Sequence, residues 1–357
     1  MRSSTTCRLT MPLVLPETHQ TPGALSAATT QLWFSLQSAP ALLKFWKLRD
    51  MSLEKREAIF SKSHHDHARV SRLVPYSSLI LTVSCVVIFL AQFYILEPLI
   101  KRYNKQYKLL KPAQQRSLIN HYVAATIKII LLFAALYPSV LIVSGRKSLH
   151  SHFGNSKVEY GDILLCVFEV FTSMYIFELF YREKVSYISA AHHIGAIIIT
   201  QTAIVLFEDP KQRQDAEIEF NLCILWGFFD IAAELWPHIA IIIYRTRPKS
   251  HAALADIFLA TAILEIIGTT TETVTIFTIF FLLWKQWTIE FRVLTPLLHI
   301  LFSCAQIWGA RVFWLMSRQH RKVVEDCEMI DVASEALSSP PNYQVEFGAK
   351  QHSMTQP

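Results

Sequence analysis

The apolar positions of the chain fall into seven long runs that are separated by short polar segments. A helix needs about 20 mostly apolar residues to cross a bilayer core about 30 Å thick, and every run reaches that length. The runs occupy approximately residues 76–96, 121–144, 158–181, 187–207, 221–244, 254–284 and 291–316. The sequence therefore predicts an all-α protein, a polytopic transmembrane helical bundle with about seven spans.

The polar segments suggest a division of the chain around these runs. Residues 1–74 contain no span, although the aromatic residues, leucines and lysines of 32–48 are typical of an interfacial amphipathic helix or of a helix packed on the domain. Residues 75–112 form an accessory first span with its loop, and residues 113–320 hold the remaining spans. Residues 321–357 are polar and contain two consecutive prolines, which predicts a disordered tail.

Composition and charge support a membrane protein. Charged residues make up 17 % of the chain, against about 25 % in soluble domains. The net charge is +6 and the basic residues lie mostly between the runs, where they suit anionic lipid headgroups. A nucleic-acid-binding protein would need a concentrated basic face, and the sequence shows none. The expected partners are membrane lipids and the bilayer; the oligomeric state is not predicted.

Neither a cofactor nor a metal site is predicted. The run from His64 to His67 contains three histidines and an aspartate, but such a run is usually solvated. A small bias of Lys and Arg among the loops favours a cytosolic C-terminus.

Ionisable residues inside the apolar runs carry the main functional signal. Asp230 and Glu234 lie near the middle of run 221–244, where a charged residue costs about 2.5–3.5 kcal/mol to insert and each Leu, Ile or Phe returns about 0.3–0.6 kcal/mol. With His238 they form one stripe, because each lies four positions after the one before it. These side chains must face other helices or a wet cavity, and such residues are functional candidates.

Further candidates gather at a similar depth. At about 1.5 Å per residue, polar residues of five spans lie in the half of the bilayer where loops 182–186 and 245–253 emerge. They could instead tie helices together through hydrogen bonds. The predicted site residues are Glu178, His192, His193, Asp230, Glu234, His238, Glu265 and Arg311.

Three segments resemble a known family. Residues 178–197, which contain Glu178, His192 and His193, are similar to the double-histidine segment of TLC-domain proteins, the superfamily that includes ceramide synthases. Residues 115–121 resemble the start of that domain in fungal-type members, and residues 226–235 resemble its later acidic helix. The resemblance implies a TLC-type core over residues 113–320, a role in lipid biology and residence in the endoplasmic reticulum.

One departure from the family pattern bears on activity. The ceramide synthase pattern places a His-Asp pair three residues ahead of a further Asp, and here the matching positions hold Trp226, Gly227 and Asp230. The resemblance therefore implies fold and lipid biology more firmly than acyl transfer.

Three functions remain open. The first is a lipid-handling protein that acts in membrane lipid homeostasis through a polar intramembrane cavity. The second is a ceramide synthase-like N-acyltransferase with acyl-CoA as cosubstrate, in which His192, His193 and Asp230 would be catalytic. The third is a transporter or receptor, against which the sequence shows no clear inverted repeat of broken helices.

Overall fold

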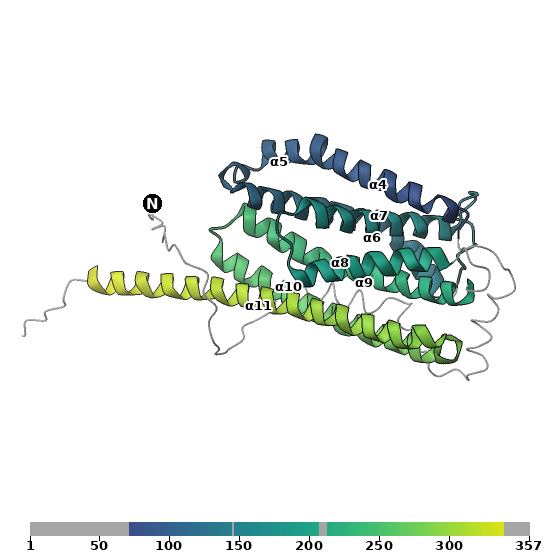
Figure 1. Ribbon diagram of the computed structural model, residues 1–357. Coiled ribbons are helices and arrows are strands. Elements are labelled where there is room, and N and C mark those ends of the chain that lie inside the picture. Colours follow the sequence, from purple (N-terminus) through teal and green to yellow (C-terminus); the bar gives the residue numbers. More distant parts are fainter. Residues whose placement is uncertain (1–70, 145, 207–212, 339–357) are drawn as a thin grey trace, which may run out of the picture.

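The computed structural model describes residues 71–144, 146–206 and 213–338. The predicted interfacial helix at 32–48, the histidine run at 64–67 and the last part of the polar tail lie outside these residues. The described residues form long helices, as the all-α prediction requires (Figure 1). The helices are α4 Ser77–Ala91, α5 Glu97–Tyr103, α6 Pro112–Val143, α7 Tyr160–Tyr181, α8 Tyr187–Leu206, α9 Arg213–Thr246, α10 His251–Leu282 and α11 Ile289–Ser338.

Six helical segments of the described residues are long and apolar enough to cross a membrane. One of them is Val74–Tyr103, in which the π-helical turn Gln92–Leu96 joins α4 to α5. The expected fifth span lies within α9, which is not among the six and carries Asp230 and Glu234 in its apolar part. The chain is therefore a multi-pass membrane protein whose helices contact the bilayer.

Helix α7 lies at the centre of the bundle. Two thirds of its apolar window is buried, and Phe168, Phe171 and Met174 belong to the main hydrophobic core. Helices α4, α6 and α8 all pack against α7, while α9 packs against α6, α8 and α10. A helix that is packed against several others can hold polar side chains away from lipid. Tyr175 and Glu178 of α7 are buried in this way.

Helix α4 lies at the edge of the bundle (Figure 1). It packs against α7 but leaves Val83, Val86 and Leu90 about half exposed. Side chains of this kind are what a lipid-facing helix presents to acyl chains. The structure thus gives the first span a peripheral position.

The beginning of α6 shows how local sequence sets a helix boundary. Lys111 is extended, Pro112 occupies the first helical position, and the Lys111 backbone N–H donates to the Gln114 side chain at 3.2 Å. Proline is favoured there because its missing N–H would have no partner in the helix. This boundary sets the register of α6 and therefore the depth of Lys128.

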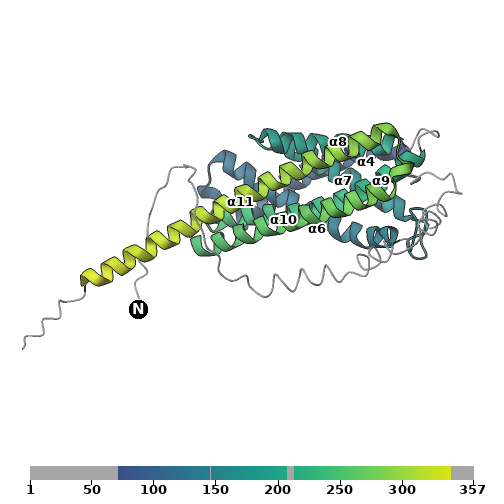
Figure 2. The same cartoon turned by 90° about the horizontal axis from the view of Figure 1, so that it is seen from below.

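Helix α11 differs from its prediction. The seventh run ends near residue 316, and residues 321–357 are predicted to be disordered, yet the helix continues to Ser338. Figures 1 and 2 show α11 leaving the bundle beside the beginning of α10 and projecting beyond it. Between Gly309 and Pro340 the sequence contains neither glycine nor proline, so nothing in the backbone stops the helix before that point.

Candidate functional site

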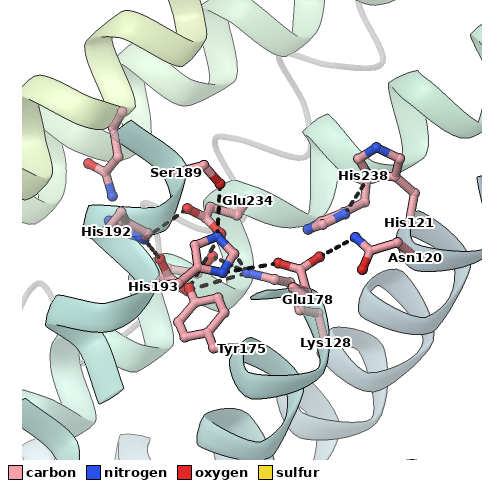
Figure 3. A network of polar contacts seen from close by, with 12 residues as sticks. Asn120, His121, Lys128, Tyr175, Glu178, Ser189, His192, His193, Glu234 and His238 are labelled. Carbon is pink, nitrogen blue, oxygen red and sulfur yellow. Dashed lines mark hydrogen bonds and ion pairs between the residues drawn. The ribbon is translucent and has the colours of Figure 1, made fainter. Parts of the chain in front are cut away.

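Lys128 is the centre of a buried ionic cluster between α6 and α9 (Figure 3). Its side chain is 0 % exposed, and its Nζ lies 2.9 Å from Glu234 Oε2 and 3.3 Å from Asp230 Oδ2. The four-residue spacing of the two acids turns both towards α6, as the stripe on α9 predicts. A lysine is tolerated at this depth because it is paired with both carboxylates.

His192 of α8 contacts the same two carboxylates from another side. Its Nε2 lies 3.2 Å from Asp230 Oδ1 and 3.1 Å from Glu234 Oε1. The Tyr175 hydroxyl donates a hydrogen bond to Asp230 from α7. Side chains of α6, α7 and α8 therefore meet at the two carboxylates of α9. His192 Nε2 donates to these carboxylates when it carries a hydrogen.

These ligand types raise the question of a metal. One atom each of His192, Asp230 and Glu234 lies within 4.8 Å of the others, a spacing that would admit a cation. The Lys128 ammonium already contacts both carboxylates. It supplies the positive charge that a metal would otherwise bring, so the arrangement is explained by the protein's own groups.

A second group of contacts surrounds Glu178 near the end of α7. Its Oε1 accepts a hydrogen bond of 2.7 Å from Asn120 Nδ2, and its Oε2 lies 3.4 Å from His193 Nδ1. His193 Nε2 lies 3.2 Å from the Ser189 hydroxyl. The ring centroids of His193 and Tyr175 are 4.3 Å apart. This ring contact joins the residues around Glu178 to the ionic cluster.

His238 lies beside this assembly and pairs with His121 of α6. Their Nδ1 atoms are 2.9 Å apart (Figure 3). In such a contact one nitrogen must carry the hydrogen and the other must accept it. The pair joins α6 to α9 one turn away from Glu234.

A cavity of about 40 Å³ lies next to the ionic cluster. By this measure a single water needs about 10–15 Å³, so the space holds a few water-sized groups. Aromatic and aliphatic side chains share its walls with polar ones. The lining residues are Phe168, Phe171, His192, Ala196, Ile199, Thr200, Cys223, Trp226, Gly227, Asp230, Glu272, Phe302 and Gln306.

The cavity wall contains a second polar network. Gln306 Nε2 on α11 donates to Glu272 Oε2 on α10 at 3.1 Å. The Trp226 indole N–H donates to His299 Nδ1 at 3.0 Å, and the two rings are stacked. The cavity is therefore bordered by hydrogen-bonding groups of α8, α9, α10 and α11.

Two predicted residues lie apart from this assembly. Glu265 of α10 is buried against α11, where a Cβ at Gly309 would lie 3.3 Å from its Oε1. Arg311 is exposed on the outside of α11, and its guanidinium lies 5.5 Å from the centre of the Trp308 ring. The structure thus does not bring Arg311 to the cavity, because equal depth does not mean that two side chains face the same way.

Several residues of the assembly were not among the predicted site residues. Lys128 is the clearest, and its signal was available: it is the one charged residue in run 121–144 and needs a counter-charge. Tyr175 lies one turn before Glu178 on α7. Asn120 and His121 lie in the family-like segment 115–121, although no role was predicted for them. Gln306 carries no local signal, because its partner Glu272 lies on another helix.

Comparison with protein-family models, with curated proteins and with solved structures finds no match. The buried polar assembly of a multi-pass membrane protein must therefore be interpreted from its own geometry.

Proposed function

We propose that this membrane protein is a lipid-handling protein that acts in membrane lipid homeostasis. The observation that carries the proposal is the cavity beside the ionic cluster. One part of its wall is formed by His192 and Asp230, and another part by Phe168, Phe171 and Phe302. Polar and aromatic walls side by side match a molecule with a polar headgroup and an apolar chain.

The resemblance to TLC-domain proteins supports this proposal. The double histidine and the acidic helix, on which the resemblance rests, are in contact through His192 and Asp230. The family's connection with lipids, and its residence in the endoplasmic reticulum, carry over as part of the proposal. The cytosolic position of the C-terminus is proposed on the charge of the loops alone.

The two positions that lack the family's His-Asp pair support a binding function over catalysis. The Trp226 indole N–H donates its hydrogen bond to His299. Gly227 packs closely against α7, since a Cβ there would lie 3.3 Å from the Phe168 ring. Both positions are therefore engaged in packing, and neither offers an acid or a base.

The lipid that accompanies the full-length protein through purification tests the proposal. We expect mass spectrometry to find a lipid enriched over the bulk membrane. Replacing His192 with phenylalanine should abolish that enrichment, because the variant removes a polar group from the cavity wall. His251→Phe is the matched control: it breaks the 2.9 Å contact with His320, and neither residue lines the cavity. Equal lipid content in the two variants, or no enrichment in the unaltered protein, contradicts the proposal.

An acyl-CoA-dependent N-acyltransferase is the second candidate, and the geometry of His192 favours it. Asp230 and Glu234 hold Nε2 of this histidine, as carboxylates orient a catalytic imidazole. A microsomal assay with a labelled long-chain base and acyl-CoA distinguishes the two candidates. Product that disappears in the His192→Ala and His193→Ala variants establishes the enzyme, while lipid enrichment without turnover supports the binding protein.

A further inference from the structure

Two polar atoms in the cavity wall have no hydrogen-bond partner among the described residues. They are His192 Nδ1 and Gln306 Oε1. Both side chains belong to residues that are more than nine-tenths buried, at 8 % and 9 % exposed, and both residues line the same cavity. A buried polar atom without a partner costs about 1–3 kcal/mol, so a ligand that satisfies both would recover stability on binding.

The existing contacts of these residues define what each atom requires. Gln306 already donates through Nε2 to Glu272, so its Oε1 requires a donor from the ligand. His192 already uses Nε2 towards the two carboxylates. Its Nδ1 accepts a hydrogen bond when the imidazole is neutral and donates one when the ring carries two protons.

The common lipid headgroups differ in how well they meet these requirements. An ionised phosphate only accepts, so it leaves Gln306 Oε1 unsatisfied and places a negative charge beside Glu272 and Asp230. An ammonium only donates, so it fails when His192 carries two protons, and Lys128 already occupies the position between Asp230 and Glu234. A hydroxyl donates one hydrogen bond and accepts another, so it satisfies Gln306 Oε1 and His192 Nδ1 together when the histidine carries two protons. That state balances the charge of the cluster, in which two carboxylates face the Lys128 ammonium and the His192 ring.

The size of the cavity agrees with a hydroxyl. A space of about 40 Å³ accommodates a few water-sized groups, which is enough for a hydroxyl and its first carbon atoms but small for a phosphocholine. Resting on the proposed function, we infer that the cavity binds the uncharged hydroxyl headgroup of a neutral lipid. The hydroxyl lies between His192 and Gln306, and the first carbon atoms beside it lie against the Phe168, Phe171 and Phe302 rings.

Binding of photoreactive lipids to the full-length protein in phosphatidylcholine nanodiscs tests this inference. A diacylglycerol probe and a sterol probe both carry the hydroxyl, and the one that crosslinks reveals whether the source is a glycerolipid or a sterol. A phosphatidic acid probe carries the same acyl chains as the diacylglycerol but a phosphate. We expect saturable crosslinking by a hydroxyl probe that is at least tenfold more efficient than crosslinking by phosphatidic acid.

Two glutamine variants locate the hydroxyl. Gln306→Met removes the unpartnered acceptor with little change in volume and should weaken binding by about two- to tenfold, the effect of one neutral hydrogen bond. The matched control is Gln201→Met, because Gln201 makes a similar 3.0 Å bond to Glu169 and does not line the cavity. If Gln306→Met does not fold, a second variant tests the inference. Ala196→Leu fills the cavity from α8 without replacing a polar side chain, and it should also reduce crosslinking.

The outcomes separate this inference from the function on which it rests. Phosphatidic acid that crosslinks at least as well as the hydroxyl probes overturns the hydroxyl assignment and leaves a lipid-handling protein. Equal losses in the two glutamine variants, or unchanged crosslinking in Ala196→Leu, also overturn it. Failure of every probe to bind saturably overturns both proposals together.

Discussion

Replacing Lys128 with methionine leaves the carboxylates of Asp230 and Glu234 without the ammonium that lies between them. The lysine side chain is 0 % exposed and contacts both acids. Removing one partner of a buried ion pair costs about 3–5 kcal/mol, because a charge remains buried without compensation. His192 still contacts both carboxylates, so we expect a loss near the lower end, about 3 kcal/mol.

The loss should be measurable as a lower melting temperature. A change of 1 kcal/mol shifts the melting temperature by about 2–4 °C in proteins of 150–250 residues and by less in a longer chain such as this one, so the variant should melt up to about 6–12 °C lower. The assay heats detergent-solubilised protein and measures the fraction that remains monodisperse by size-exclusion chromatography. The double variant Lys128→Met with Glu234→Gln should recover part of the loss, because one of the uncompensated charges is removed as well.

Lys101 provides the control for this experiment. Its Nζ lies 2.7 Å from Glu97 Oε1, which is closer than either contact of Lys128, but its side chain is 53 % exposed. An exposed ion pair contributes about 0–1 kcal/mol, so Lys101→Met should change the melting temperature by a few degrees at most. Comparable losses in the two single variants, or an unchanged melting temperature for Lys128→Met, would refute the argument that burial sets the cost.

Two further substitutions test other contacts by the same thermal measurement. Trp226→Phe keeps a ring for stacking but removes the donor to His299 Nδ1, so we expect a loss of about 1–3 kcal/mol; a neutral result would mean that this bond contributes nothing. Gly195→Ala places a Cβ about 3.0 Å from the Phe302 ring and should destabilise the α8–α11 contact by about 1–3 kcal/mol. Combining it with Phe302→Ala should cost less than the sum of the two single variants, and simple additivity would show that the two residues do not interfere.

The sequence could predict which acids face the interior but not what they contact. Asp230 and Glu234 are too costly to expose to lipid, so energetics alone turns them inward. Their partner Lys128 lies 102 and 106 residues away along the chain. That pairing depends on how α6 and α9 cross, which no local pattern records.

The estimated depths of the polar residues in the bilayer indicate which of them lie at a similar level, but not the direction in which each side chain points. Glu178 and His193 are in contact, as their similar depths suggested, whereas Arg311 faces outward at a comparable depth. Neighbouring positions on a helix point about 100° apart, and depth carries no information about that angle. The polar composition of residues 321–357 predicts disorder, but α11 continues to Ser338. A helix that is already formed extends without a new nucleation cost, and composition alone does not record this.

Helix α11 both contributes to the cavity wall and extends outside the bundle. Ser317 and Arg321 fasten α11 to the first turns of α10 through the Ala255 carbonyl and Asp256. From Arg321 the helix continues for roughly 25 Å to Ser338, at about 1.5 Å per residue. In the other direction, the same unbroken helix carries Gln306 into the cavity wall. The projecting end and this part of the cavity wall therefore belong to one continuous helix, and a substitution that breaks the helix between them would separate the two.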